Sequence, residues 1–446
     1  MRSTETISPI RYPYPEACDH ARYAPGLAAP ETFYGLPREI RFCQRCGYSN
    51  QKPNSEKEFK HNIQTRKPTV VFDAEGICSA CRVADTKKSV DWASRERELR
   101  ELCDRHRRSD GHYDCLVPGS GGKDSFYAAH QLKYVYGMNP LTVTWAPHIY
   151  TEWGWQNFQA WIHAGFDNHL FTPNGRGHRL LTRLAIENLF HPFQPFIMGQ
   201  MYFPPKMAVQ FDIPLVFYGE NPTEYGNRAN ENATSRKDLS YFTAADRDDL
   251  YVAGASVHEL REEFGLSQLD LDPYLPLTPA QVEGKQLDVQ YLGYYLPWHP
   301  QECYYYAVEH GGFRAAPERT AGTYSKYSSI DDKIDDLHYY TTFIKFGIGR
   351  ATYDASQEAR NGDITREEAV ALIRRYDGEY SERFEADNFA YLSLPEREFP
   401  VASRRFEQPL MDRAYFERLT DRFRSPHLWM WQDGGWRLRK TIFQGD

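Results

Sequence analysis

The 446-residue chain lacks any apolar run long enough to cross a bilayer, and its first residues lack the hydrophobic core of a signal peptide. We therefore expect a cytoplasmic protein that does not enter the membrane. The chain also lacks an excess of positive charge, because its formal net charge is −8. One basic stretch, residues 87–108, is interleaved with acidic residues and predicts a solvated helix. This charge pattern argues against nucleic acid as a partner.

Cysteine is scarce, at eight residues, and half of it lies in two CxxC pairs. This usage argues against a secreted disulfide scaffold and favours metal binding in a reducing compartment. Each pair can place two thiolates on one ion, so the pairs together predict a structural Zn²⁺ site formed by Cys43, Cys46, Cys78 and Cys81. The long segment between the pairs leaves a redox or iron–sulfur role open. Of the other cysteines, Cys115 lies within an expected strand, where we expect it to be buried.

The composition and hydrophobic pattern of the chain change along its length and predict five parts. Residues 1–40 are rich in proline and tyrosine and predict an extended arm, and residues 41–82 hold a zinc-ribbon-like cysteine module. Residues 83–222 alternate strands with helices, which predicts an α/β domain with a parallel sheet flanked by helices. Residues 223–330 predict loops and short helices over the site. Residues 331–446 predict a helical region that completes it.

Hydrophobic periodicity places the individual elements. Strands are expected at residues 113–118, 141–145, 168–172 and 214–218. Helices are expected at residues 88–107, 123–136, 152–164, 177–190, 331–346 and 365–376. A capping box, Thr365 to Glu368, marks the start of the last of these helices.

The most informative stretch is the glycine-rich turn at residues 120–125, between an expected strand and an expected helix. Backbone N–H groups and the positive end of a helix make such a turn an anion site, usually for phosphate. The spacing excludes a Walker A loop, which needs four residues between its first glycine and Gly-Lys-Ser/Thr. It resembles instead the PP-loop of ATP pyrophosphatases. The expected pyrophosphate ligands are Ser120, Gly121, Gly122, Lys123 and Ser125, and the expected Mg²⁺ ligand is Asp124.

Two further candidates follow neighbouring strands, and ligands of parallel sheets bind beyond the carboxyl ends of the strands. Glu220 follows the strand at 214–218 and is a candidate second Mg²⁺ ligand or substrate contact, with a surface carboxylate as the alternative. Trp145 ends the strand at 141–145, whose backbone would contact adenine. Two interpretations of Trp145 stay open: it lines the adenine pocket, or it belongs to the core.

Several motifs, in order and spacing, resemble the N-acetyl sugar amidotransferases of bacterial surface-glycan biosynthesis, which act on lipopolysaccharide or flagellin glycans. The matching segments are residues 41–46, 49–53, 76–82, 91–92, 113–125, 136–145, 213–221 and 345–347. The resemblance covers about residues 36–380. The arm before Tyr34 lies outside the family pattern.

The resemblance implies an adenine nucleotide alpha hydrolase-like (PP-loop) fold and an ATP-dependent carbon–nitrogen ligase. ATP would activate the oxygen of a sugar acetamido group as an adenylate, and pyrophosphate would leave. Ammonia would then convert the group to acetamidino and release AMP. By the same resemblance, Lys345 is a second cation for pyrophosphate, with an exposed helix lysine as the alternative.

The chain lacks the signatures of a glutaminase, since it begins Met-Arg-Ser and no cysteine lies in a Gly-x-Cys-x-Gly elbow. The resemblance implies two separate partners, a glutaminase subunit and an ammonia-channel subunit similar to the two parts of imidazole glycerol phosphate synthase. Two other functions stay open. One is a PP-loop enzyme that thiolates tRNA, and the other is a non-catalytic nucleotide-binding scaffold.

Overall fold

The computed structural model describes residues 10–11, 14–227, 234–247, 249–394, 406–407 and 410–444. The rest of the expected N-terminal arm, residues 1–9 and 12–13, lies outside these ranges. So do parts of the expected C-terminal region, residues 395–405, 408–409 and 445–446.

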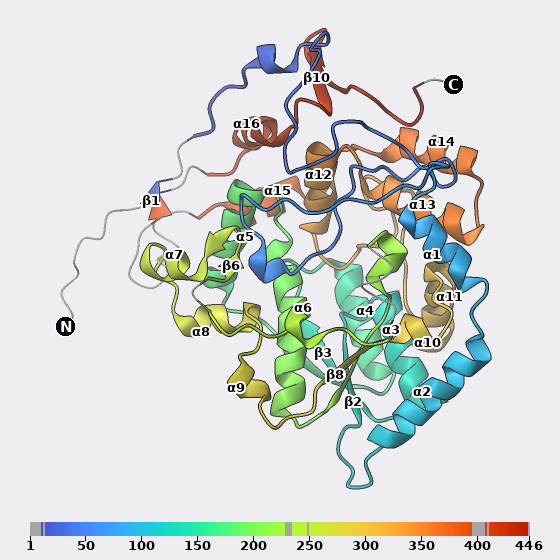
Figure 1. Cartoon of the computed structure of the whole chain (residues 1–446). Helices are drawn as coiled ribbons and strands as arrows, with labels where there is room; N and C mark the ends of the chain where they lie inside the picture. The colour runs from blue at the N-terminus through green and yellow to red at the C-terminus, as the bar shows by residue number, and fades with distance from the viewer. Residues whose placement is uncertain are drawn as a thin grey trace, which may run out of the picture.

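Five parallel strands form the central sheet, and helices cover both of its faces (Figure 1). The strands are β2 (Cys115–Pro118), β3 (Pro140–Trp145), β4 (Asp167–Phe171), β5 (Leu215–Tyr218) and β8 (Asp288–Tyr291). Their order in space is β4-β3-β2-β5-β8. This arrangement confirms the predicted α/β class. The edge strand β8 was not predicted, because its four residues lie in a segment of mixed charges, aromatics and prolines.

Alternation along the short strands divides the core into two layers. Leu116 and Val216 belong to the cluster formed with α5 and α6, whereas Cys115 and Val117 belong to the cluster on the opposite face. Cys115 is fully buried, as predicted. The helices on the two faces are α2 (Trp92–His106), α3 (Lys123–His130), α4 (Glu152–His163), α5 (Gly175–Leu189), α6 (Gln194–Gln210) and α11 (Pro300–Gly311).

The expected long helices differ from the structure at three places. The helix expected at 331–346 begins only at Asp335. The expected helix at 123–136 is present, and its last part, η3 (Gln131–Val135), continues directly from α3 as a π-helical turn. The charged stretch at 88–107 corresponds to α2, and a shorter helix, α1 (Ser79–Lys87), precedes it. Within the described ranges, no helix combines the length and apolar character needed to cross a membrane.

Short elements fill the segment between β5 and α11. They are η4 (Pro222–Tyr225), η6 (Leu239–Tyr241), β6 (Tyr251–Val252), β7 (Ala255–Ser256), α7 (Val257–Glu262), α8 (Gln268–Leu271), η7 (Asp272–Tyr274), α9 (Pro279–Val282) and α10 (Leu292–Tyr295). The strands β6 and β7 form a small antiparallel pair.

The C-terminal region contains helices and one hairpin. Its elements are α12 (Asp335–Phe346), α13 (Arg350–Asn361), α14 (Arg366–Tyr376), α15 (Glu385–Leu392), α16 (Arg413–Phe423), β10 (Trp429–Gln432) and β11 (Gly435–Leu438). The predicted capping box between Thr365 and Glu368 is present at the start of α14.

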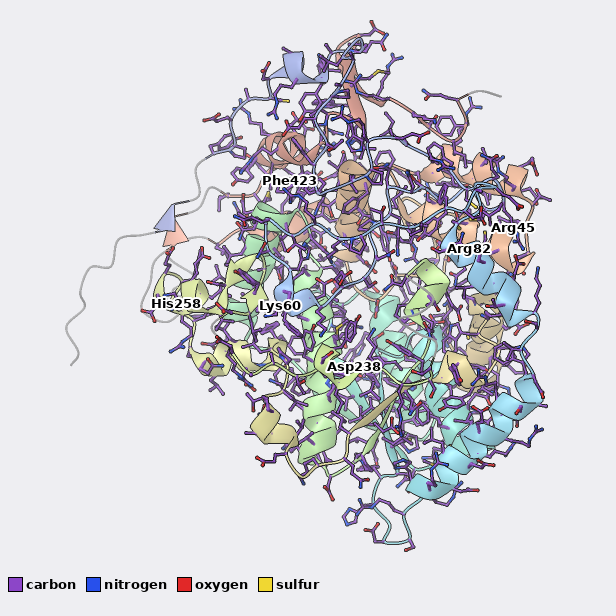
Figure 2. All side chains as sticks on the ribbon, viewed as in Figure 1. Arg45, Lys60, Arg82, Asp238, His258 and Phe423 are labelled. Atoms are coloured by element: carbon purple, nitrogen blue, oxygen red, sulfur yellow. The ribbon has the colours of Figure 1, made fainter. Side chains whose placement is uncertain are left out.

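The N-terminal segment, residues 14–40, lies along this C-terminal region rather than along the sheet (Figure 1). It holds the short helix η1 (His20–Tyr23), and residues 10–11 form β1 (Ile10–Arg11) beside β9 (Phe406–Glu407). The Tyr23 hydroxyl donates to the carbonyl of Arg424, and the Tyr34 hydroxyl donates to the carbonyl of Phe423, which Figure 2 labels. A further short helix, η2 (Glu58–Lys60), follows the first CxxC pair.

Candidate functional site

The predicted phosphate loop lies where the strand order of the sheet reverses. From β2 the chain continues outward to β3 and β4 on one side, and then returns to place β5 and β8 on the other side. In open parallel sheets, the crevice beyond the carboxyl ends of the strands at such a reversal is a ligand site. Residues 119–122 follow β2, and residues 219–221 follow β5. The sheet therefore brings the loop and Glu220 to one crevice.

Close packing explains the glycines of the loop. Gly121 has φ +85°, and a Cβ there would lie 2.8 Å from Cα of Phe158 and 2.9 Å from the carbonyl oxygen of Asn157. At Gly119, a Cβ would lie 2.2 Å from that of Ser125. Only glycine fits both positions without a shift of the chain.

The first turn of α3 presents backbone donors at the loop. Gly122 is the N-cap residue and has no side chain that could accept from the first N–H groups of α3, so these N–H groups have no side-chain cap. A helix N-terminus of this kind attracts an anion.

Three charged groups gather at this loop. The Lys123 ammonium donates to Asp124 at 2.5 Å, and the lysine is nearly buried. Burial opposes its charge, but Asp124, Cys303 and Glu220 outweigh burial and raise the pKa of Lys123. Burial first, and then repulsion from Asp124, raises the pKa of Glu220 to about 7. The structure thus places both predicted Mg²⁺ ligands beside the predicted phosphate lysine.

Two cavities meet at the loop. The larger has a volume of about 640 Å³ and the smaller about 430 Å³. Both are lined by Ser120, Gly122, Asp124 and Glu220. The loop therefore forms part of a wall that the two adjoining cavities have in common.

The smaller cavity has an aromatic lining that includes Trp145, Tyr218 and Tyr291. The indole of Trp145 packs directly on Gly199 of α6, where a Cβ would lie 2.2 Å from the ring, and only 3% of the residue is exposed. Trp145 is thus a core tryptophan that also lines a cavity. Its contact with adenine stays a prediction.

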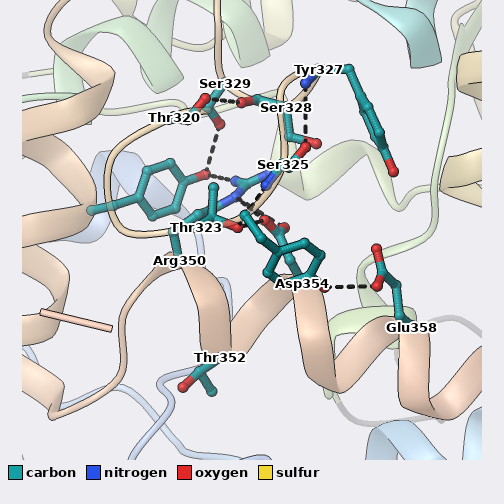
Figure 3. Close-up of polar contacts among 12 residues, drawn as sticks. Thr320, Thr323, Ser325, Tyr327, Ser328, Ser329, Arg350, Thr352, Asp354 and Glu358 are labelled. Carbon is teal, nitrogen blue, oxygen red and sulfur yellow. Dashed lines mark hydrogen bonds and ion pairs between the residues drawn. The ribbon is translucent and has the colours of Figure 1, made fainter. Parts of the chain in front are cut away.

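The larger cavity has a polar wall supplied by α12, α13 and the segment before them (Figure 3). Arg350 pairs with Asp354 at 3.0 Å and contacts the hydroxyl of Tyr339. The Tyr324 hydroxyl donates to Glu358 at 2.8 Å. Apart from Lys345, the sequence analysis did not identify this wall. Its members are spread over about 35 residues and follow no motif.

Lys345 lines the larger cavity, but its ammonium donates to the carbonyl of Leu189 at 2.6 Å. The residue is 6% exposed, which rules out the alternative of an exposed helix lysine. Burial first, and then the charge of Lys67, lowers the pKa of Lys345 to about 7. Its contact with pyrophosphate stays a prediction.

Sequence reasoning also missed Cys303 on α11. This thiol lies close enough to Asp124 and Lys123 for their charges to act on it, and it is 1% exposed. Burial and then Asp124 raise its pKa, so the thiol form is favoured. Its isolated position in the sequence, within a run of tyrosines, gives no signal of this placement.

The four CxxC cysteines form one buried cluster, as predicted. Sγ of Cys43 lies 3.8 Å from that of Cys81, and Sγ of Cys46 lies 3.7 Å from that of Cys78. A tetrahedron of thiolates around zinc, with bonds of about 2.3 Å, has edges of about 3.8 Å. The cluster therefore fits a metal such as zinc, and its four ligands would leave no open position on the ion.

The cysteine module contacts both the crevice and the C-terminal region. Arg360 of α13 lies 3.7 Å from Sγ of Cys46, and Lys52 donates to the carbonyl of Tyr225 at 2.7 Å. Arg45 and Arg82 lie on the outer side of the module (Figure 2). Through the contact between Lys52 and Tyr225, the module helps to hold the segment that follows Glu220 in place.

Residues 321–442 match a family model described as the C-terminal domain of WbpG-like LPS biosynthesis proteins. This match supports the expected relation to a lipopolysaccharide or glycan biosynthesis family. The matched segment includes the polar wall of the larger cavity. No curated protein matches the chain. The PP-loop assignment stays a prediction.

Replacing Gly121 with alanine should abolish the anion site, because the added Cβ would collide with the backbone of α4. On the prediction that this loop binds Mg·ATP, we expect the affinity for Mg·ATP, measured by calorimetry, to fall strongly, because the loop backbone must shift to make room for the Cβ. Gly111→Ala is the matched control, since Gly111 also has positive φ, +82°, but an added Cβ meets nothing within 4 Å. Equal losses in both variants would contradict a steric role specific to Gly121.

The four-cysteine cluster predicts one tightly held metal ion, expected to be zinc, that resists dialysis against EDTA. Cys46→Ser should lose this ion and lower the melting temperature, because structural zinc contributes about 10–16 kcal/mol to small zinc domains. Elemental mass spectrometry measures the metal bound per chain in the wild type and in Cys46→Ser. Iron with visible absorption in place of zinc would instead favour the iron–sulfur interpretation.

The depressed pKa of Lys345 predicts how stability depends on pH. Between pH of about 7 and its ordinary pKa of 10.5, the unfolded chain holds a proton on this lysine that the folded chain lacks. Stability should therefore rise with pH over this window, and Lys345→Met should remove that contribution. Denaturant unfolding at several pH values measures it, with the exposed Lys88→Met as control. A slope unchanged in Lys345→Met would refute the buried, depressed lysine.

Proposed function

We propose that the chain is the synthetase subunit of an ATP-dependent amidotransferase that converts an acetamido group of a sugar to an acetamidino group. The product would enter lipopolysaccharide or a related surface glycan. The observation that carries the proposal is the pair of cavities with a common wall, the loop at residues 120–124. A reaction between ATP and a second substrate needs two spaces that meet at the transferred phosphorus.

ATP would occupy the smaller cavity. Its aromatic lining suits adenine, and its mouth reaches the N-terminus of α3, where phosphates would bind. Asp124 and Glu220 would hold a Mg²⁺ ion on the phosphates, because carboxylate oxygens are the ligands that Mg²⁺ prefers. Lys123 would exchange its internal pair with Asp124 for a phosphate oxygen.

The sugar would occupy the larger cavity. Polyols are recognised by groups that donate and accept hydrogen bonds, and the polar wall offers carboxylates, hydroxyls and a guanidinium (Figure 3). This wall belongs to the segment that matches the WbpG-like domain, which connects the family match to the sugar side of the site.

The chemistry explains why ATP must be split between its α- and β-phosphorus. The amide oxygen attacks the α-phosphorus, the bond to the β-phosphate breaks, and pyrophosphate leaves with the charge that Lys123 stabilises. Ammonia then adds to the amide carbon, loses protons to solvent, and AMP leaves with the former amide oxygen. The protein mainly aligns the two substrates and neutralises charge.

Ammonia would come from a separate glutaminase through a channel subunit. The alternative function, thiolation of tRNA, needs a reactive thiolate near the loop. Cys303 is the cysteine that the described structure places there, and burial raises its pKa, which opposes a thiolate. The raised pKa of Cys303 therefore supports the ligase over thiolation of tRNA.

The test mixes the purified chain with ATP, Mg²⁺, ammonium and a panel of acetamido sugars. We expect AMP and pyrophosphate to form only with the true sugar, and the product mass to show one nitrogen gained and one oxygen lost. Lys123→Met should lower turnover by about 100-fold or more, as the loss of one charge-stabilising donor does elsewhere.

Lys88→Met, an exposed lysine outside the site, is the control and should retain the wild-type rate. Turnover that requires tRNA in place of a sugar would support the thiolation alternative. A wild-type biological activity in Lys123→Met would leave only the nucleotide-binding scaffold.

A further inference from the structure

A second group of metal-ligand side chains lies far along the chain from the four-cysteine cluster. One atom each from Cys18, His20 and Asp421 lie within 4.8 Å of one another. The first two residues belong to the N-terminal segment around η1, and Asp421 lies in the last turn of α16. Two segments that are about 400 residues apart in sequence thus converge on one point.

Packing fixes each member of this group. The His20 ring stacks on Trp431 of the C-terminal hairpin, with ring centres 3.9 Å apart and planes 9° apart. Cys18 packs against the hydrophobic cluster of the C-terminal region. Asp421 accepts from Arg424 at 3.3 Å through one carboxylate oxygen. The neighbouring Arg22 is neutralised by Glu31 at 2.7 Å.

We propose that Cys18, His20 and Asp421 form a second site for a zinc-class divalent metal. A thiolate, an imidazole and a carboxylate are the three ligand types that zinc takes in proteins, and three protein ligands leave one coordination position for water. The thiolate and the carboxylate bring negative charge to the ion, and Asp421 shares its charge with Arg424. Burial raises the pKa of the Cys18 thiol to about 11, so the metal itself must displace the proton.

The proposed site would act as a clip between the N-terminal segment and the C-terminal domain. The same segment continues to Tyr34 and Leu36, which line the larger cavity. Metal bound at the clip would therefore hold one wall of that cavity in place. This gives a role to the arm that lies outside the family pattern, and it does not rest on the proposed reaction.

The two metal sites should differ in how readily they release their metal ion to a chelator. His20 is exposed and the proposed site has an open position, whereas the four cysteines are fully buried. Dialysis of the full chain against EDTA should therefore empty the new site and leave the cysteine cluster loaded. Titration with Co²⁺ should then show one equivalent binding, with a thiolate-to-cobalt absorption band.

Single substitutions identify the ligands. Cys18→Ser, His20→Gln and Asp421→Asn should each weaken Co²⁺ binding by more than about 100-fold, since even outer-shell partners cost about 10–100-fold. Cys18→Ser should also remove the absorption band. Cys103→Ser, a buried cysteine of α2, is the matched control and should bind as the wild type does.

The side chain of His20 is exposed, so we expect His20→Gln to fold as the wild type does. Circular dichroism measures whether each variant keeps its fold. Added Zn²⁺ should raise the melting temperature of the EDTA-treated wild type and leave that of His20→Gln unchanged. A wild type that binds no metal after dialysis would overturn the proposal. Unchanged binding in Cys18→Ser and His20→Gln would overturn it as well.

Discussion

The parallel direction of five short strands is the constraint on which the rest of the structure depends. Because all five carboxyl ends lie at one edge, the loop after β2 and Glu220 after β5 must meet at the point where the strand order reverses. The sheet supplies only one side of a crevice. The cysteine module and the C-terminal region close the other sides, so residues from distant parts of the chain complete a site that begins at Ser120.

The sequence was most informative where local physical rules act alone. Strand alternation, the close-packed glycines of the loop at residues 119–122 and the two CxxC pairs each follow from short-range chemistry, and the structure contains all three. The strand β8 and the polar wall around Arg350 could not be predicted, because long-range packing creates them. Lys345 and Trp145 also show that long-range packing could not be predicted from the sequence. Their positions in sequence were identified, but their burial and partners depend on α5 and α6.

Two buried lysines, Lys52 and Lys345, line the larger cavity. No local sequence pattern predicts their burial. Burial lowers the pKa of both Lys52 and Lys345 to about 7, so each is poised between its charged and neutral forms. An anionic ligand nearby would favour the charged forms and draw protons from solvent. These two lysines can therefore gain charge when a negative ligand binds, which lowers the cost of burying a permanent charge at their positions.

The contact between Tyr23 and Arg424 joins residues 401 positions apart. It can therefore form only near the end of the synthesis of the chain. The N-terminal segment leaves the ribosome first, yet its binding surface is among the last parts to emerge. At about 5–20 residues per second, the segment waits roughly 20–80 s for that surface. Closure of the larger cavity is therefore a late event in the synthesis of each chain, whereas the last strand of the sheet, β8, is already complete at residue 291.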